Sequence, residues 1–139
     1  MSVQQNRGAQ PPTAEKAPPG WLRALDLVAV SLFVVIGLSV HGHSLGTGSV
    51  ISTLWPFAAA LAVAWLAVGF WARDVLSLPS GATAAVVTDA VAMVLRVVSG
   101  QGTAAAFIAV ALVFLGATFL AWRLLAGLVW RRPRVRSRT

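Results

Sequence analysis

The chain has 139 residues, of which 58% are hydrophobic and only 11% are charged, whereas a soluble domain carries about 25% charged residues. This composition excludes a soluble domain and indicates an integral membrane protein. The absence of cysteine excludes disulfides, thiolate metal sites and cysteine nucleophiles. The formal net charge of +7 collects at the ends of apolar segments, as in membrane proteins, so we expect the lipid bilayer, and no nucleic acid, as a partner.

The first 20 residues, MSVQQNRGAQPPTAEKAPPG, are interrupted by prolines and contain no large apolar residue apart from Met1 and Val3. Such a segment buries too little surface to offset the entropy of ordering it. We therefore predict a disordered cytoplasmic tail over residues 1–20. A cleaved signal peptide is the alternative interpretation, but no small-residue cleavage pattern follows the next apolar run.

Four apolar stretches follow, and each is long enough to cross a bilayer as a helix, which takes about 17 to 25 residues. The second contains no charged residue, and Pro56 lies in its first turns, where a missing backbone donor is tolerated. The predicted fold class is all-α: a four-transmembrane-helix bundle made of two helical hairpins. The membrane domain covers residues 21–130, and its predicted helices are residues 21–40, 51–71, 82–98 and 103–130.

Lysine and arginine are distributed unevenly among the segments that flank these helices. The N-terminal flank, Arg73 in the second connection and the basic tail at residues 131–139 carry them, whereas residues 41–50 and 99–103 have none. Because cytoplasmic flanks carry the excess of basic residues, we predict cytoplasmic N and C termini in a multi-pass protein of the cell (cytoplasmic) membrane. The basic tail is interpreted as a topology determinant, and contact with anionic lipid head groups is the alternative.

The third predicted helix carries Asp89 and Arg96 inside an otherwise apolar sequence. They are seven residues apart, so they share one face of the helix and lie about 10 Å apart along its axis. Arg96 can snorkel to the nearby outer boundary, but Asp89 lies near mid-bilayer. The two residues form a candidate intramembrane polar site. Three interpretations of Asp89 remain open: a neutral acid bonded to a neighbouring helix, a partner of Arg96 that holds the bundle together, or a proton or cation site.

Asp26 has a more ordinary interpretation. It lies about one turn inside Arg23 at the start of the first helix, and Arg123 lies towards the end of the fourth, on the same predicted side of the membrane. We predict that Asp26 and Arg123 form a cytoplasmic-edge ion pair, and we favour this role over catalysis.

The predicted topology gathers a second set of polar residues on the outer side, close to Arg96. This candidate outer polar cluster consists of His41, His43, Trp55, Ser99, Gln101 and Thr103. An arginine and two histidines near the start of a helix could bind an anion; the alternative is that these are ordinary interfacial residues. Two imidazoles without a nearby carboxylate make a weak metal site, and no phosphate or dinucleotide motif is present. We therefore expect no metal, no cofactor and no catalytic residue.

Several segments of the chain carry a resemblance to one family. They are LVAVSLFVVIGLSVHG in the first helix, the Trp55-Pro56-Phe57 opening of the second, the stretch from Leu95-Arg96 through SGQGT to Phe107, and the closing Trp122-Arg123. Over about residues 21–130 the chain resembles the domain-of-unknown-function 3054 family of small bacterial and archaeal membrane proteins. The resemblance implies a prokaryotic four-helix membrane protein with no assigned activity, and it adds no catalytic residue.

Together these features predict an integral membrane protein that is not an enzyme. The leading hypothesis is permeation of a small solute or ion, with entry at the outer polar cluster and Asp89 at mid-membrane. Four thin helices leave little lumen in a monomer, so we expect a homo-oligomer or a membrane partner protein. The first alternative is a structural or accessory membrane protein without transport activity, and the second is a lipid- or quinone-binding subunit.

Overall fold

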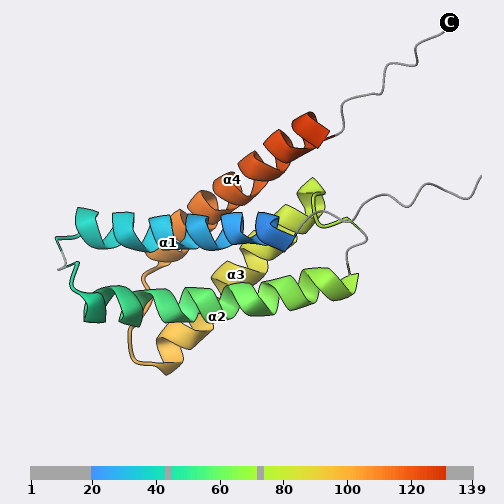
Figure 1. Cartoon of the computed structure of the whole chain (residues 1–139). Helices are drawn as coiled ribbons and strands as arrows, with labels where there is room; N and C mark the ends of the chain where they lie inside the picture. The colour runs from blue at the N-terminus through green and yellow to red at the C-terminus, as the bar shows by residue number, and fades with distance from the viewer. Residues whose placement is uncertain (1–19, 43–44, 72–73, 131–139) are drawn as a thin grey trace, which may run out of the picture.

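The computed structural model describes residues 20–42, 45–71 and 74–130 (Figure 1). A single 3-10 turn, Gly20–Leu22, leads into α1 (Arg23–Val40), which is followed by α2 (Thr47–Trp71), α3 (Leu78–Val98) and α4 (Ala105–Trp130). The described residues contain no strand, and all four helices are long and apolar enough to span a membrane. The predicted all-α, four-transmembrane-helix bundle is confirmed. Apart from Gly20, the two predicted tails lie outside the described residues.

The helices differ from the predicted ranges mainly where they begin. α2 begins at Thr47 and α3 at Leu78, in each case four residues earlier than predicted. The predicted ranges left both segments in the connections between helices, but Ser77 caps α3 by accepting a hydrogen bond of 3.3 Å from the amide of Ser80. Pro79 then lies in the first turn, where no backbone donor is needed. Polar residues suit these first turns because the amides there lack partners within the helix.

The four helices form a ring in which each packs against two others. α2 packs against α3, α3 against α4, and α1 against both α2 and α4; Figure 1 shows α4 running obliquely to α1 and α2. We call the end of the bundle where α1 begins and α4 ends the terminal end. We call the opposite end, with the α1–α2 and α3–α4 connections, the loop end. This ring brings residues from opposite ends of the sequence together.

Two kinds of packing fill the interior of the ring. Aromatic rings from α1, α2 and α4 form a cluster with neighbouring ring centroids between 5.4 and 6.2 Å apart; its members are Phe33, Phe57, Phe107 and Phe114. Small side chains fill the interior faces of α2 and α3 and let the two backbones approach closely. The buried alanines of these two helices are Ala60, Ala64, Ala84, Ala85 and Ala92.

Large apolar side chains cover the outside of the bundle. Leu66 is 64% exposed, Val113 is 70% exposed and Val98 is 81% exposed. A soluble monomer rarely leaves large contiguous apolar patches uncovered, whereas lipid tails are as apolar as these side chains. The chain is therefore a multi-pass membrane protein.

Candidate functional site

Buried polar side chains meet at the terminal end in one bonded group, the Asp26 clamp, which consists of Asp26, Trp65, Trp122 and Arg123. The Asp26 side chain is fully buried, and that of Arg123 is 1% exposed. Arg123 donates two hydrogen bonds to the carboxylate, from Nη1 to Oδ1 at 2.9 Å and from Nη2 to Oδ2 at 3.0 Å. The indole nitrogens of Trp122 and Trp65 donate to the same two oxygens at 2.8 and 3.2 Å. The carboxylate therefore accepts four hydrogen bonds.

Arg123 also ties the clamp to its surroundings. Its Nε donates to the carbonyl of Val75 at 3.2 Å, in the α2–α3 connection, and its Nη1 donates to the carbonyl of Phe119 at 3.0 Å. Its guanidinium carbon lies 4.2 Å from the ring centroid of Trp122, a cation–π distance. A buried ion pair offsets its desolvation only when additional hydrogen bonds complete its geometry. Here those bonds come from α2, α4 and the α2–α3 connection.

Gly81 of α3 makes room for the Arg123 side chain. A Cβ at this position would lie 2.7 Å from Cδ and 3.2 Å from Nε of Arg123. The guanidinium is held by its bonds to Asp26 and Val75, so it cannot move aside without breaking them. All four helices thus contribute to the clamp, three through hydrogen bonds and α3 through the space at Gly81.

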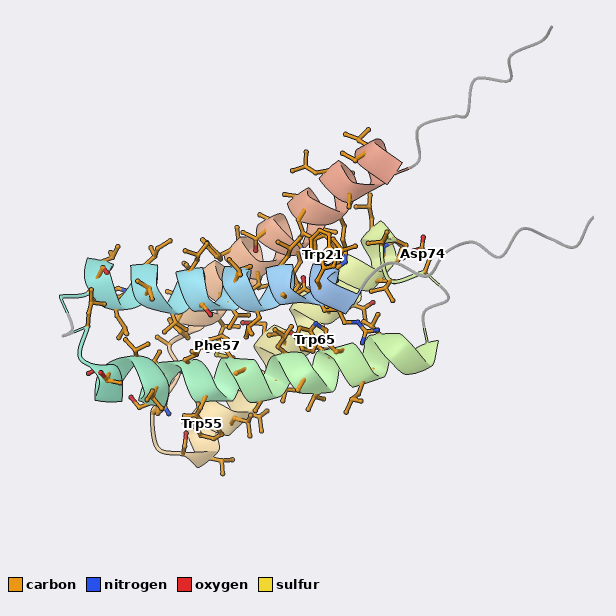
Figure 2. All side chains as sticks on the ribbon, viewed as in Figure 1. Trp21, Trp55, Phe57, Trp65 and Asp74 are labelled. Carbon is orange, nitrogen blue, oxygen red and sulfur yellow. The ribbon has the colours of Figure 1, made fainter. Side chains whose placement is uncertain are left out.

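The structure brings Asp26 and Arg123 together with Trp65 and Gly81, two residues that the sequence analysis did not single out. Trp65 lies on α2 where that helix faces α1 (Figure 2). An indole N–H inside an apolar span needs a hydrogen-bond partner, and that signal could have identified Trp65. The sequence carries no such signal for Gly81, because its role depends on which side chain of α4 crosses it.

Asp89 of α3 lies within the bundle and is 4% exposed. Among the described residues, its enclosed Oδ1 meets no hydrogen-bond donor, and the hydroxyl of the adjacent Thr88 is also unpartnered. Arg96 bonds to Gln101, and no ion pair joins it to Asp89 in this part of the chain. The interpretation of Arg96 as the partner of Asp89 is therefore not supported. Buried polar atoms without a partner are rare, which makes Asp89 the anomalous carboxylate.

The SGQGT turn positions Arg96 through a Schellman motif at the end of α3. The amide of Gln101 donates to the carbonyl of Arg96 at 2.9 Å, and the amide of Gly100 donates to that of Val97 at 3.0 Å. Gly100 has a φ of 74°, a left-handed conformation that glycine adopts without strain. The Gln101 side chain then accepts from Nη1 of Arg96 at 3.0 Å and donates to the carbonyl of Ser52 at 2.9 Å. Gln101 thus links α3 to the first turns of α2.

A cavity of about 210 Å³, the Arg96 cavity, lies at the loop end and is lined by all four helices. Arg96 lines it with its guanidinium carbon 4.7 Å from the ring centroid of Phe107. His41 and Thr53 add polar groups, and the remaining walls, which include Phe33, are apolar. Nε of Arg96 is enclosed and meets no acceptor in the described residues. The cavity therefore combines a partly satisfied cation with apolar walls.

Most other members of the predicted outer polar cluster do not line this cavity. Trp55 is 42% exposed and lies on the side of α2 away from α1 (Figure 2). Ser99 donates to carbonyls of its own helix, and Thr103 is partly exposed. His43 lies outside the described residues. Thr53 lines the cavity instead, and a single threonine in an apolar helix gave no sign of that role.

Replacing one partner of the clamp should destabilise the protein more than replacing both. Arg123→Gln leaves the Asp26 carboxylate buried without its cation, which should lower the free energy of unfolding by about 3–5 kcal/mol. The double variant Asp26→Asn/Arg123→Gln should recover part of that loss, because it buries no uncompensated charge. Unfolding in mixed micelles of rising SDS content, followed by circular dichroism, measures each value. Arg23→Gln, at an exposed position, is the control and should stay within about 0.5 kcal/mol of wild type. A double variant whose loss of stability equals the sum of the losses in the two single variants would contradict the prediction.

Gly81→Ala should also destabilise the bundle, although alanine is the better helix former. The added methyl group would displace the Arg123 side chain, at about 1–3 kcal/mol as for other overpacked sites. Gly116→Ala in α4 is the matched control, because a Cβ there meets nothing within 4 Å. The same unfolding measurement compares the two variants. Equal stability of both would show that Gly81 is not required for the clamp.

Comparisons with known proteins concern the bundle as a whole. A family model described as "Protein of unknown function (DUF3054)" matches residues 23–126. That range begins with the first residue of α1 and includes both residues of the ion pair. The comparison with curated proteins and the comparison with solved structures each found no match. Because the family model covers most of the chain and confirms the resemblance seen in the sequence, the chain belongs to the domain-of-unknown-function 3054 family.

Proposed function

We propose that the protein serves the permeation of a small solute or ion, with Asp89 as its mid-membrane site. The observation that carries this proposal is the enclosed carboxylate oxygen of Asp89, which has no hydrogen-bond partner among the described residues. An aspartate at the centre of a membrane helix costs about 2.5 to 3.5 kcal/mol. Ionisable residues retained inside a membrane commonly mark substrate or ion pathways.

The contrast with Asp26 supports this reading of Asp89. Both carboxylates are buried, with 0% and 4% of the residue exposed. Asp26 accepts hydrogen bonds from Trp65, Trp122 and Arg123, as a structural carboxylate in an apolar interior should. Asp89 has no comparable partner in the described part of the chain, so it can take up a proton, a cation or a water molecule.

Permeation through this bundle requires an assembly or a rearrangement. Phe33 and Phe107 line the Arg96 cavity, and the rings of Phe57 and Phe114 pack against Phe33 behind them. Four helices whose interior is filled by these rings and by small side chains leave little lumen in a monomer. We therefore assign permeation to a homo-oligomer or to a complex with a membrane partner protein, in which the chain transforms no substrate and is not an enzyme.

A structural or accessory membrane protein is the second candidate, and the Asp26 clamp favours it. A buried ion pair whose hydrogen bonds join three helices is what a scaffold for a partner protein needs, and permeation does not require it. A lipid- or quinone-binding subunit is the third candidate. It is favoured by an apolar surface hollow of about 610 Å³ on α4, lined by residues such as Val110, Val113 and Phe114.

Asp89→Asn separates these candidates, because it keeps the shape of the side chain and removes its charge. If permeation is correct, the variant should fold and accumulate normally but lose flux. The measurement is stopped-flow light scattering of proteoliposomes challenged in turn with urea, sodium chloride and sodium acetate. Asp74→Asn, the same change in the α2–α3 connection, is the matched control and should keep flux.

Three results would count against a permeation role for the Asp89 charge. Wild-type flux equal to that of empty liposomes would contradict permeation of these solutes. Normal flux through Asp89→Asn would exclude the charged carboxylate as carrier. Loss of folded protein in the Asp89→Asn variant would favour the structural candidate.

We also propose that the terminal end faces the cytoplasm of a prokaryotic cell. The support is the distribution of basic residues in the sequence. Arg23 begins α1, Arg73 follows the last residue of α2 by two positions, and the arginines of residues 131–139 come after α4, whereas residues 41–50 and 99–103 contain no Lys or Arg. Green fluorescent protein fused after Thr139 should fluoresce, and alkaline phosphatase fused there should be inactive. The opposite pair of results would contradict the orientation.

A further inference from the structure

We infer that the Arg96 cavity is a binding site for a small monocarboxylate with an apolar body. The site lies at the loop end of the bundle, seven residues along α3 from Asp89, and uses a different group. Binding there does not depend on permeation. It would serve equally as the entry site of a permeation protein or as the ligand site of an accessory subunit.

The protein holds the Arg96 guanidinium in place and leaves most of its donors unused. Gln101 accepts one hydrogen bond from Nη1, and Phe107 supports the face of the group. A guanidinium carries five N–H donors, and one hydrogen bond, from Nη1, engages them among the described residues. Nε is enclosed, so a ligand would meet the terminal Nη1 and Nη2 groups. Because an arginine pairs most strongly with a planar carboxylate, through two parallel hydrogen bonds, a carboxylate is the acceptor that fits.

The charge of the cavity lining selects a single negative charge. Arg96 is the one fixed charge among the described residues that line the cavity, and His41 and Thr53 are the other groups there with polar side chains. A dianion would bring a second charge for which the lining offers no second fixed cation, and an unpaired buried charge is costly. A cation would be repelled by Arg96, and a neutral apolar molecule would leave its donors unpaired.

The volume and the apolar walls of the cavity limit the size and polarity of the part of the ligand that carries the carboxylate. Its volume is about 210 Å³, and an apolar cavity of about 150 Å³ is enough to hold benzene. The rings of Phe33 and Phe107, with Val34 and Leu38, provide apolar walls, against which a ring or a short aliphatic chain gains by leaving water. A benzoate-sized molecule therefore fits both the volume and the chemistry.

A carboxylate with an apolar body can reach the site from two sources. It can be a free carboxylic acid from the aqueous phase, which would enter past the exposed His41. It can also be a fatty acid from the bilayer, whose head group presents the same carboxylate to Arg96. Both ligands present a carboxylate to Arg96. A competition experiment distinguishes the aqueous source from the bilayer source.

The test is equilibrium dialysis of radiolabelled benzoate against the full chain purified in detergent. We expect saturable binding of benzoate, none of benzylamine, and at least about tenfold weaker binding of benzyl alcohol, since a hydrogen bond to a charged group accounts for such a factor. Arg96→Gln should weaken benzoate binding by a similar factor, and Arg96→Lys should restore part of it. Arg23→Gln removes the same charge from an exposed position outside the cavity and should bind as the wild type does.

Two results would overturn the site: equal binding of benzoate and benzyl alcohol, or unchanged benzoate affinity in a folded Arg96→Gln variant. If Arg96→Gln does not fold, the site is tested by comparing benzoate, benzylamine and benzyl alcohol on the wild type, and by benzoate binding to the Arg96→Lys variant. Displacement of benzoate by hexadecanoate in the micelles identifies the bilayer as source, and displacement by hexanoate alone identifies the aqueous phase. Because dialysis measures no flux, a failure of permeation and a failure of this site are distinguishable.

Discussion

The ion pair between Asp26 and Arg123 is buried at the terminal end of an apolar bundle, and that end is organised around it. A buried pair of charges offsets its desolvation when additional hydrogen bonds satisfy its remaining donors and acceptors, and here those partners come from several helices. Trp65 comes from α2, Trp122 from α4 and the carbonyl of Val75 from the α2–α3 connection. Satisfying one pair of charges thus sets how α1, α2 and α4 rotate and approach one another.

The same requirement distinguishes Asp26, Arg96 and Asp89, three ionisable residues inside the spans. Asp26 is completely bonded, and its role is structural. Arg96 is partly bonded, because Gln101 and Phe107 hold it while other donors remain unused. Asp89 has no partner in the described residues. Since unbonded charge in a membrane persists only where something offsets its cost, the incompletely bonded positions are where a ligand, a proton or a partner chain is to be sought.

The two ends of the bundle therefore differ in structure. The terminal end is closed by a clamp for which Gly81 provides space. The loop end holds a cavity whose cation is aimed by a glycine-dependent turn after α3. Between them lies the aromatic cluster around Phe33. A hydrogen-bonded terminal end and a cavity at the loop end suit the proposed binding of a small molecule near one membrane surface.

The sequence by itself determined the all-α class, the four spans and the shared end of Asp26 and Arg123, because span length, charge placement and an even number of crossings are local or countable properties. It missed the early starts of α2 and α3, since capping residues such as Ser77 look like ordinary loop residues until a helix follows them. Only the tertiary structure decided that Trp65 and Gly81 serve the clamp, that Arg96 bonds to Gln101, and that Oδ1 of Asp89 meets no donor among the described residues. Those outcomes depend on how each helix is rotated against its neighbours, and no pattern within a single helix encodes that rotation.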